Sequence, residues 1–311
     1  MNDLKPRPFP NFFLIGAPKA GTSALYHGLK QHPEIFMSPV KEPHFFSFEG
    51  QAPLFAGPKG DHFRRTGIYR PFDYLSLFAS VAKHRAVGEA STTYLGSPIA
   101  ARRIGKSVPG AKVIALLRQP ADRAYSHYQY LKAQGAEDAD SFETAIAQEC
   151  DRKSDGWFSG HLYVEGGFYF TQLSRFYDAF PRDQIKVYLY DDWNRAPHAI
   201  IHDLFDFLEV DGDFVPEIGR KNVTLVPRNS FLNNLAWKPG RVERLLAPYC
   251  AAPLVKKLVL AIQNLNRSLN LYKPPPLAPE THRRLTAGYS EDIMNLQNLI
   301  GRDLTHWLNT G

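Results

Sequence analysis

The sequence predicts an α/β fold, a three-layer sandwich in which helices cover both faces of a central parallel sheet. Two observations support this fold class. Several apolar runs are continuous rather than alternating, which is typical of strands that are buried on both faces of a sheet. Most of these runs precede a segment with helical periodicity, and alternation of strands and helices favours a doubly wound sheet.

The expected elements follow in chain order. We predict buried strands at Phe12–Gly16, Val87–Ala90, Val113–Leu117 and Ile185–Tyr190. We predict helices at Thr22–Gln31, Ala121–Gln134, Phe168–Phe180 and Ala196–Leu208. Residues 47–72 are rich in glycine, proline and aromatic residues, which predicts a long loop over the carboxyl edge of the sheet.

The C-terminal region predicts one more helix. Residues 272–280 contain four prolines and predict a stiff connector. Apolar residues then recur at helical spacing, which predicts a helix over about 280–308 docked on the core. The length allows one large α/β domain or two small ones, and no internal repeat is evident. We expect residues 1–311 to form a single domain.

Composition narrows the classes of function. With 44% hydrophobic and 22% charged residues, the chain is typical of a globular protein, and no apolar run is long enough to span a membrane. Two cysteines and the lack of an N-terminal leader pattern favour the cytoplasm. The net charge of +6 comes from isolated basic pairs rather than a stripe, so we expect no nucleic-acid partner and no membrane partner. The excess positive charge fits a small, multiply anionic ligand, and the oligomeric state stays open.

The stretch "GAPKAGTS", residues 16–23, predicts an anion site. A buried strand ends at Gly16 and a helix begins near Thr22, and N–H groups at a helix N-terminus attract phosphate. The glycine spacing is P-loop-like, but Thr22 stands where an ATP- or GTP-binding loop has its lysine. Lys19 lies inside the loop instead, which suits one phosphate carrying a transferable group without a metal. The alternative is a tight turn with no ligand.

A second anion site is expected after the strand Val113–Leu117. Arg118 stands at the carboxyl end of this strand, where open α/β sheets bind ligands. Ser126 lies about two turns into the following helix, so an arginine and a hydroxyl would meet at one phosphate. The alternative is that Arg118 only pairs with Asp122.

Two separate anion sites on one sheet resemble the PAPS-dependent sulfotransferase family, in its bacterial, heparan-sulfotransferase-like branch. "PKAGTSAL" is similar to the family's 5′-phosphosulfate loop and "RQPADRAYSHY" to its 3′-phosphate segment. "KEPHFF", residues 41–46, is similar to a Glu-x-x-Phe-Phe element of the heparan-type branch. The segments "GFYFTQLSRFYDAFPRDQIKVYLYDDW" and "GRDLTHWL" extend the likeness over most of the chain.

The resemblance implies in-line transfer of a sulfuryl group from 3′-phosphoadenosine-5′-phosphosulfate (PAPS) to a hydroxyl, less often an amine, of a small-molecule or carbohydrate acceptor. The by-product would be PAP, and no metal would be required. Glu42 would be the general base, with His44 as its rival, and Lys19 would stabilise the leaving phosphate. The donor would be bound by the following residues: Lys19, Ala20, Gly21, Thr22, Ser23, Arg118, Ser126, Lys221 and Arg220.

Some positions depart from the branch. Ala90 stands where heparan-type enzymes have a lysine, and Tyr130 where the N-sulfotransferases have a histidine. These departures bear on the acceptor and leave the donor site intact. A set of aromatic residues would line the acceptor pocket or belong to the core: Phe45, Phe46, Phe48, Phe63, Tyr69 and Phe72.

Three other functions remain as alternatives. A nucleotide-dependent kinase with an aberrant P-loop would need Mg²⁺ and a lysine after Gly21. A non-catalytic nucleotide-binding protein would bind the donor regardless of Glu42. A nucleic-acid binder would need a basic stripe that the chain lacks.

Overall fold

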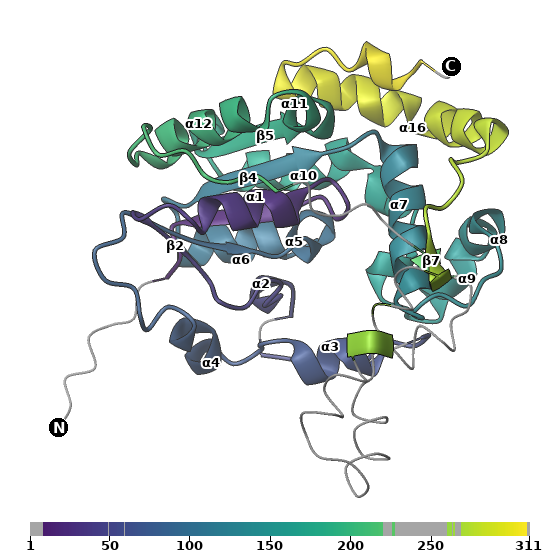
Figure 1. Ribbon diagram of the computed structural model, residues 1–311, viewed down its shortest axis with the longest axis horizontal. Helices are drawn as coiled ribbons and strands as arrows, with labels where there is room; N and C mark the ends of the chain where they lie inside the picture. Colours follow the sequence, from purple (N-terminus) through teal and green to yellow (C-terminus); the bar gives the residue numbers. More distant parts are fainter. Residues whose placement is uncertain are drawn as a thin grey trace, which may run out of the picture.

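The computed structural model describes residues 9–48, 50–58, 60–219, 226–227, 260–262, 264 and 269–309 of the 311-residue chain. Five parallel strands form its central sheet in the order β2-β3-β1-β4-β5 (Figure 1). Their bounds are β1 Phe12–Gly16, β2 Ile35–Met37, β3 Ala86–Ala90, β4 Lys112–Leu117 and β5 Ile185–Leu189. The predicted parallel sheet is therefore confirmed.

Helices cover both faces of the sheet, which confirms the three-layer sandwich (Figure 1). On one face α1 packs against α12, and on the other α5 and α6 pack against α10. The helices up to α7 are α1 Thr22–Leu29, α2 Phe45–Phe48, α3 Asp61–Thr66, α4 Pro71–Ser76, α5 Thr93–Gly96, α6 Ala100–Ser107 and α7 Pro120–Ala133. The later ones are α8 Phe142–Ala147, α9 Glu149–Ser154, α10 Tyr169–Ala179, α11 Tyr190–Arg195, α12 Pro197–Leu208 and α16 Pro279–Ile300.

The predicted strands agree with β1, β3, β4 and β5, and the predicted helices with α1, α7, α10 and α12, within a few residues. The C-terminal helix was expected to reach about residue 308, but α16 ends at Ile300, and α2, α5, α6, α8, α9 and α11 were not expected. Strand β2 was not expected, because three residues are too few to carry a periodic pattern. Residues 47–72 were expected to form a loop, but α3 and the start of α4 lie within them. Both helices have local start signals that the loop-like composition obscured, namely Asp61 in the first turn of α3 and Pro71 at the start of α4.

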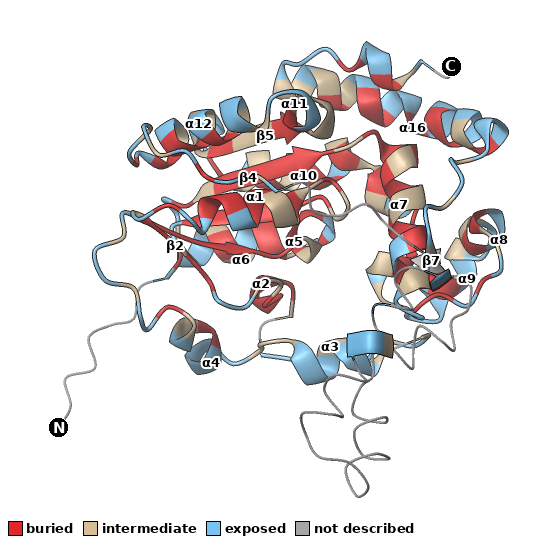
Figure 2. Ribbon diagram, in the orientation of Figure 1, coloured by how far each residue is buried: buried red, intermediate tan, exposed pale blue. Residues whose placement is uncertain are grey.

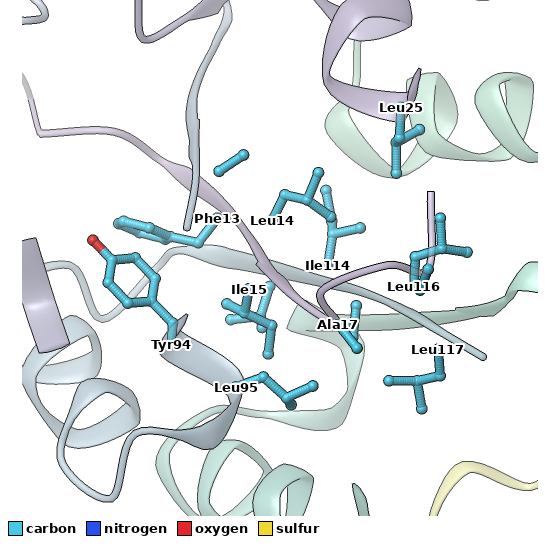
Figure 3. Close-up of a cluster of buried hydrophobic side chains, with 14 of the residues drawn as sticks. Phe13, Leu14, Ile15, Ala17, Leu25, Tyr94, Leu95, Ile114, Leu116 and Leu117 are labelled. Atoms are coloured by element: carbon cyan, nitrogen blue, oxygen red, sulfur yellow. The ribbon is translucent and has the colours of Figure 1, made fainter. Parts of the chain in front are cut away.

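The core is built around β1, whose five residues are all buried. Figure 2 shows the central strands as buried, with exposed residues on the outer faces of the helices. In Figure 3, Phe13 lies beside Tyr94 and Ile15 beside Leu95, both from α5. Leu25 of α1 lies on the opposite side of the strand. Burial on both sides explains why the sequence of β1 is continuously apolar.

Helix α16 packs against α10 and α7. Its buried residues include Leu285, Tyr289, Ile293 and Leu296, which belong to the apolar series noted in the sequence. The Asp292 carboxylate accepts hydrogen bonds from the N–H groups of Phe170 and Thr171 at the start of α10. Contacts of this kind satisfy N–H groups that have no partner within their own helix.

A carboxylic acid is buried inside the sheet. Glu89 of β3 is completely buried, and neither carboxyl oxygen has a well-formed hydrogen bond to another described residue. Burial raises its pKa to about 8, although the nearby hydroxyl of Tyr94 acts in the opposite direction. Between the ordinary glutamate pKa and pH 8, the folded protein therefore keeps a proton that the unfolded chain releases.

We expect this proton to make folding stability fall as the pH rises from about 4.5 to about 8, with a slope of up to about 1.4 kcal/mol per pH unit. The Glu89→Gln variant cannot ionise at this position. The melting temperature of the variant, minus that of the unmodified protein, should therefore increase from pH 5 to pH 8. Thermal unfolding over this range measures the effect, with the exposed Glu291→Gln as control. Parallel curves for Glu89→Gln and the unmodified protein would contradict the assignment.

Candidate functional site

A cleft of about 2000 Å³ contains most of the candidate residues identified from the sequence. It is lined by the loop after β1, by residues that follow β3 and β4, and by one side of α7. These segments meet at the carboxyl edge of the sheet, where open α/β folds bind their ligands. Residues 273–277 of the proline-rich connector also line it, and the Tyr125 hydroxyl donates to the Pro275 carbonyl oxygen at 2.9 Å.

The loop between β1 and α1 presents Lys19, Gly21, Thr22 and Ser23 to the cleft. Gly21 directly precedes the helix with φ 98°, a backbone conformation that favours glycine. The first N–H groups of α1 have no partner inside the helix and point toward its N-terminal end. Ala20 differs from its neighbours because its side chain is fully buried and its N–H bonds to the Ala17 carbonyl. The loop can therefore bind an anion with Lys19, Gly21, Thr22 and Ser23, and the Ala20 side chain takes no part in this site.

Lys19 is a cation in a poorly solvated place. Burial, followed by repulsion from Arg118 and Lys41, lowers the pKa of its ammonium group to about 8. Among the described residues its recorded contact is the ring of Tyr130, with the Nζ atom 4.4 Å from the ring centroid. No described carboxylate pairs with it. An anion bound here would supply the negative charge that the Lys19 ammonium group lacks as a partner.

Arg118 and Ser126 line the same cleft from the end of β4 and from α7. The guanidinium group of Arg118 lies 3.9 Å from the Asp122 carboxylate and 4.9 Å from the centroid of the Tyr190 ring. The pairing with Asp122 is thus present, but Asp122 is about half exposed and the contact is long. A solvated pair of this kind is weak, so Arg118 can also bind an anion in the cleft.

Glu42 and His44 lie next to each other at the cleft. The Glu42 carboxylate accepts from Lys41 Nζ and from the Thr92 N–H, both at 2.7 Å. His44 Nδ1 lies 2.9 Å from Thr93 Oγ1 and 3.8 Å from Glu42 Oε2. Burial lowers the pKa of His44 to about 4, which keeps its imidazole neutral at neutral pH.

The backbone is strained at the three candidate catalytic residues. Lys19, Glu42 and His44 have φ values of 67°, 64° and 61°, in the left-handed region that side chains other than glycine avoid. Such positions cost about 1–3 kcal/mol each and concentrate at functional sites. The left-handed conformations at Glu42 and His44 show that this segment is not an extended strand.

Several lining residues were missed by sequence reasoning. Thr92 and Thr93 hold Glu42 and His44 in place, and they follow β3 at its carboxyl end, which was a usable signal. His127 lines the cleft from α7, but its neighbours in the sequence give no pattern that marks it. Of the six candidate aromatic residues only Phe63 lines the cleft, whereas Phe45 and Phe46 are core residues.

Part of the expected donor site cannot be placed. Arg220 and Lys221 lie outside the described residues. Within the part of the chain that is described, no group of three or more acidic, histidine or cysteine side chains is arranged to hold a metal ion. No helix in the same part is long and apolar enough to cross a membrane.

Comparison with known proteins identifies the family. Residues 9–233 match the family model described as sulfotransferase domain. A solved sulfotransferase from Alicyclobacillus acidocaldarius is 31% identical, with a TM-score of 0.75, over 97% of this chain and 100% of that chain. The membrane-associated sulfotransferase kil1 of Dictyostelium discoideum is 24% identical over 67% of this chain and 58% of its own length.

Two further curated relatives carry carbohydrate names. Bifunctional heparan sulfate N-deacetylase/N-sulfotransferase 2 of Bos taurus is 28% identical over 65% of this chain and 22% of its own length. Carbohydrate sulfotransferase 15 of Homo sapiens is 26% identical over 66% of this chain and 44% of its own length. The chain thus spans less than two thirds of each of these curated relatives. Because the family model matches most of the sequence, the chain belongs to the sulfotransferase domain family, a family of transferases.

Proposed function

We propose that the protein transfers a sulfuryl group from PAPS to a hydroxyl group of a small-molecule or carbohydrate acceptor, with an amine as the less favoured acceptor group. The observation that carries the proposal is the buried Lys19 ammonium at the N-terminus of α1, close to Arg118 and Lys41 and without a described anionic partner. A cluster of cations at a helix N-terminus fits a phosphosulfate.

The residues present fit such a donor. The loop Lys19–Ser23 and the start of α1 would hold the 5′-phosphosulfate, and Arg118 with Ser126 would hold the 3′-phosphate in the same cleft. Lys221 and Arg220 are proposed to complete this second site. When bound, PAPS would supply the sulfuryl group and leave as PAP. We propose no metal for this reaction.

Each catalytic role follows from where the side chain lies. Lys19 would stabilise the negative charge that grows on the phosphate oxygen as the bond to sulfur breaks. Glu42 would accept the proton from the acceptor hydroxyl as its oxygen bonds to sulfur. We favour Glu42 over His44 because burial depresses the basicity of His44 and Thr93 engages its Nδ1 atom. His44 would then orient the acceptor or Glu42.

Two alternatives are less well supported. The kinase alternative is not favoured, since the family match is to sulfotransferases and Thr22 still stands where the kinase lysine would be. A non-catalytic nucleotide-binding protein would keep the donor loops but would have no use for the strained, hydrogen-bonded Glu42 at the cleft.

Thermal unfolding with PAP tests the donor. A ligand at 100 times its Kd adds about 2.7 kcal/mol of stability, so PAP without metal should raise the melting temperature measurably. ATP with Mg²⁺ serves as the comparison. A shift with Mg-ATP alone would overturn the proposal in favour of the kinase.

Lys19 should make PAP binding pH-dependent. The ammonium is protonated below its pKa of about 8 in the free protein, and a bound anion would raise that pKa, so the affinity should fall as the pH rises above 8. Lys19→Met should weaken binding, remove this fall and reduce turnover at least about 100-fold. The exposed Lys30→Met on the end of α1 is the matched control. Calorimetric titrations from pH 6.5 to 9.5 measure the effect, and an unchanged profile in Lys19→Met would exclude the role.

Paired variants distinguish whether Glu42 or His44 is the general base. Glu42→Gln keeps the shape but cannot take a proton, so kcat should fall about 10²–10⁴-fold while the Kd for PAP stays within twofold. His44→Gln should lower kcat less than Glu42→Gln does. The reverse order of the two losses in steady-state assays would make His44 the base.

A further inference from the structure

Side chains that lie next to one another in series line the part of the cleft beside Lys19 and Glu42, and we call this series the circuit. The Lys19 ammonium lies over the ring of Tyr130, whose centroid is 6.3 Å from that of His127. On the opposite side, Glu42 lies 3.8 Å from His44, and the ring of His44 is 5.1 Å from that of Phe63. All of these residues line the cleft.

Two segments far apart in the sequence close this circuit. The rings of Phe63 and Phe158 are 3.9 Å apart, and the Phe55 ring also contacts Phe158 at 5.3 Å. The backbones join beside them, where the Ala56 N–H donates to the Gly156 carbonyl at 3.1 Å. Phe158 in turn contacts His161, which lies near His127. The region next to Lys19 and Glu42 is therefore enclosed chiefly by rings.

The enclosing side chains carry little charge apart from Lys19 and Glu42. Burial keeps His44 neutral, with a pKa of about 4, and it lowers the pKa of His127 well below its usual range. Phe63, Phe158 and Tyr130 add only apolar or phenolic surface. The walls thus suit a neutral molecule.

Three cations that line the cleft around this region already have partners, and Arg118 is assigned to the donor in the proposed function. Lys41 pairs with the Glu42 carboxylate at 2.7 Å. The guanidinium group of Arg123 is buried and donates to the Tyr163 carbonyl oxygen. Arg175 donates to the Gly96 carbonyl oxygen at 3.3 Å. Recognition of a polyanion needs arginine and lysine side chains that are free to pair with it, and among the described lining residues these three are engaged.

One polar side chain in the circuit is available. His127 is 8% exposed, lines the cleft and forms no hydrogen bond with any described residue. A buried imidazole without a partner costs stability, and a ligand can satisfy it. The His127 imidazole can make one hydrogen bond to an otherwise apolar acceptor. Pockets for small molecules are typically apolar with a few polar groups at fixed positions, and His127 fits that description.

We propose that the acceptor of this enzyme is an uncharged hydroxyl compound with a flat, apolar body, such as a phenol, rather than an acidic glycan. Its ring would pack against the contacting pair of Phe63 and Phe158. Its hydroxyl would face Glu42 and Lys19, and His127 would bind a second polar group if the acceptor has one. The inference rests on the proposed sulfuryl transfer.

A matched pair of acceptors tests the charge of the pocket. 2-Naphthol and 6-hydroxy-2-naphthoate share the ring system and a reactive hydroxyl, and only the second carries a carboxylate. With PAPS as donor and sulfate-ester formation followed by mass spectrometry, kcat/KM for 2-naphthol should exceed that for the naphthoate at least about tenfold. An uronic-acid-containing disaccharide is the third acceptor. Equal or faster reaction of either acidic acceptor would overturn the inference.

Variants test the ring wall. Phe158→Leu should raise the KM for 2-naphthol about three- to tenfold with little change in the Kd for PAP, because it removes one aromatic contact. Phe63→Leu is the second variant, and Phe72→Leu, an exposed phenylalanine outside the cleft lining, is the control. If neither wall variant changes KM, the ring wall does not bind the acceptor and the inference fails.

The outcomes separate this inference from the donor proposal. If PAP stabilises the protein but no neutral hydroxyl compound in a panel of phenols and primary alcohols is sulfated, the acceptor inference is wrong and the donor site stands. If PAP does not bind, both fail.

Discussion

The buried charge of Lys19 is the constraint on which the site depends. An ammonium group pushed out of water and placed near two other cations is destabilised, as its lowered pKa records. The fold accepts this cost at the carboxyl end of β1, where the left-handed turn at Lys19 and Gly21 starts α1. An anion that binds at this helix end would remove the electrostatic penalty, so the proposed donor site and the geometry of the loop follow from one arrangement.

Two glutamates close to the cleft illustrate how environment divides their roles. Glu42 is partly exposed, and its carboxylate accepts hydrogen bonds from Lys41 and from the Thr92 N–H. Glu89 is buried in β3 below it, and burial keeps it protonated at neutral pH. Their mutual repulsion adds to the raised pKa of Glu89. Of these two glutamates, Glu42 is therefore the one proposed to take a proton from a bound molecule.

The region beyond Lys19 owes its character to contacts between distant parts of the chain. Residues 55–63 and 156–158 meet through backbone and ring contacts and enclose the cleft next to Glu42. The relatives whose names mention heparan sulfate or carbohydrate share the family with this chain. The proposed acceptor surface is a separate feature, because its residues lie in α3, in α7 and around Phe158, outside the central sheet.

The sequence by itself determined strands β1, β3, β4 and β5, helices α1, α7, α10, α12 and α16, and the position of Lys19 in the loop. Burial on both faces and helix starts leave local patterns in these segments. It also pointed to Arg118, Ser126, Glu42 and His44 as site residues, and their roles stay predictions. Only the tertiary structure decided that Lys19 is desolvated, that Ala20 faces the core and that His127 faces the cleft. These properties depend on what packs against each side chain from other elements, and that information is not local in the chain.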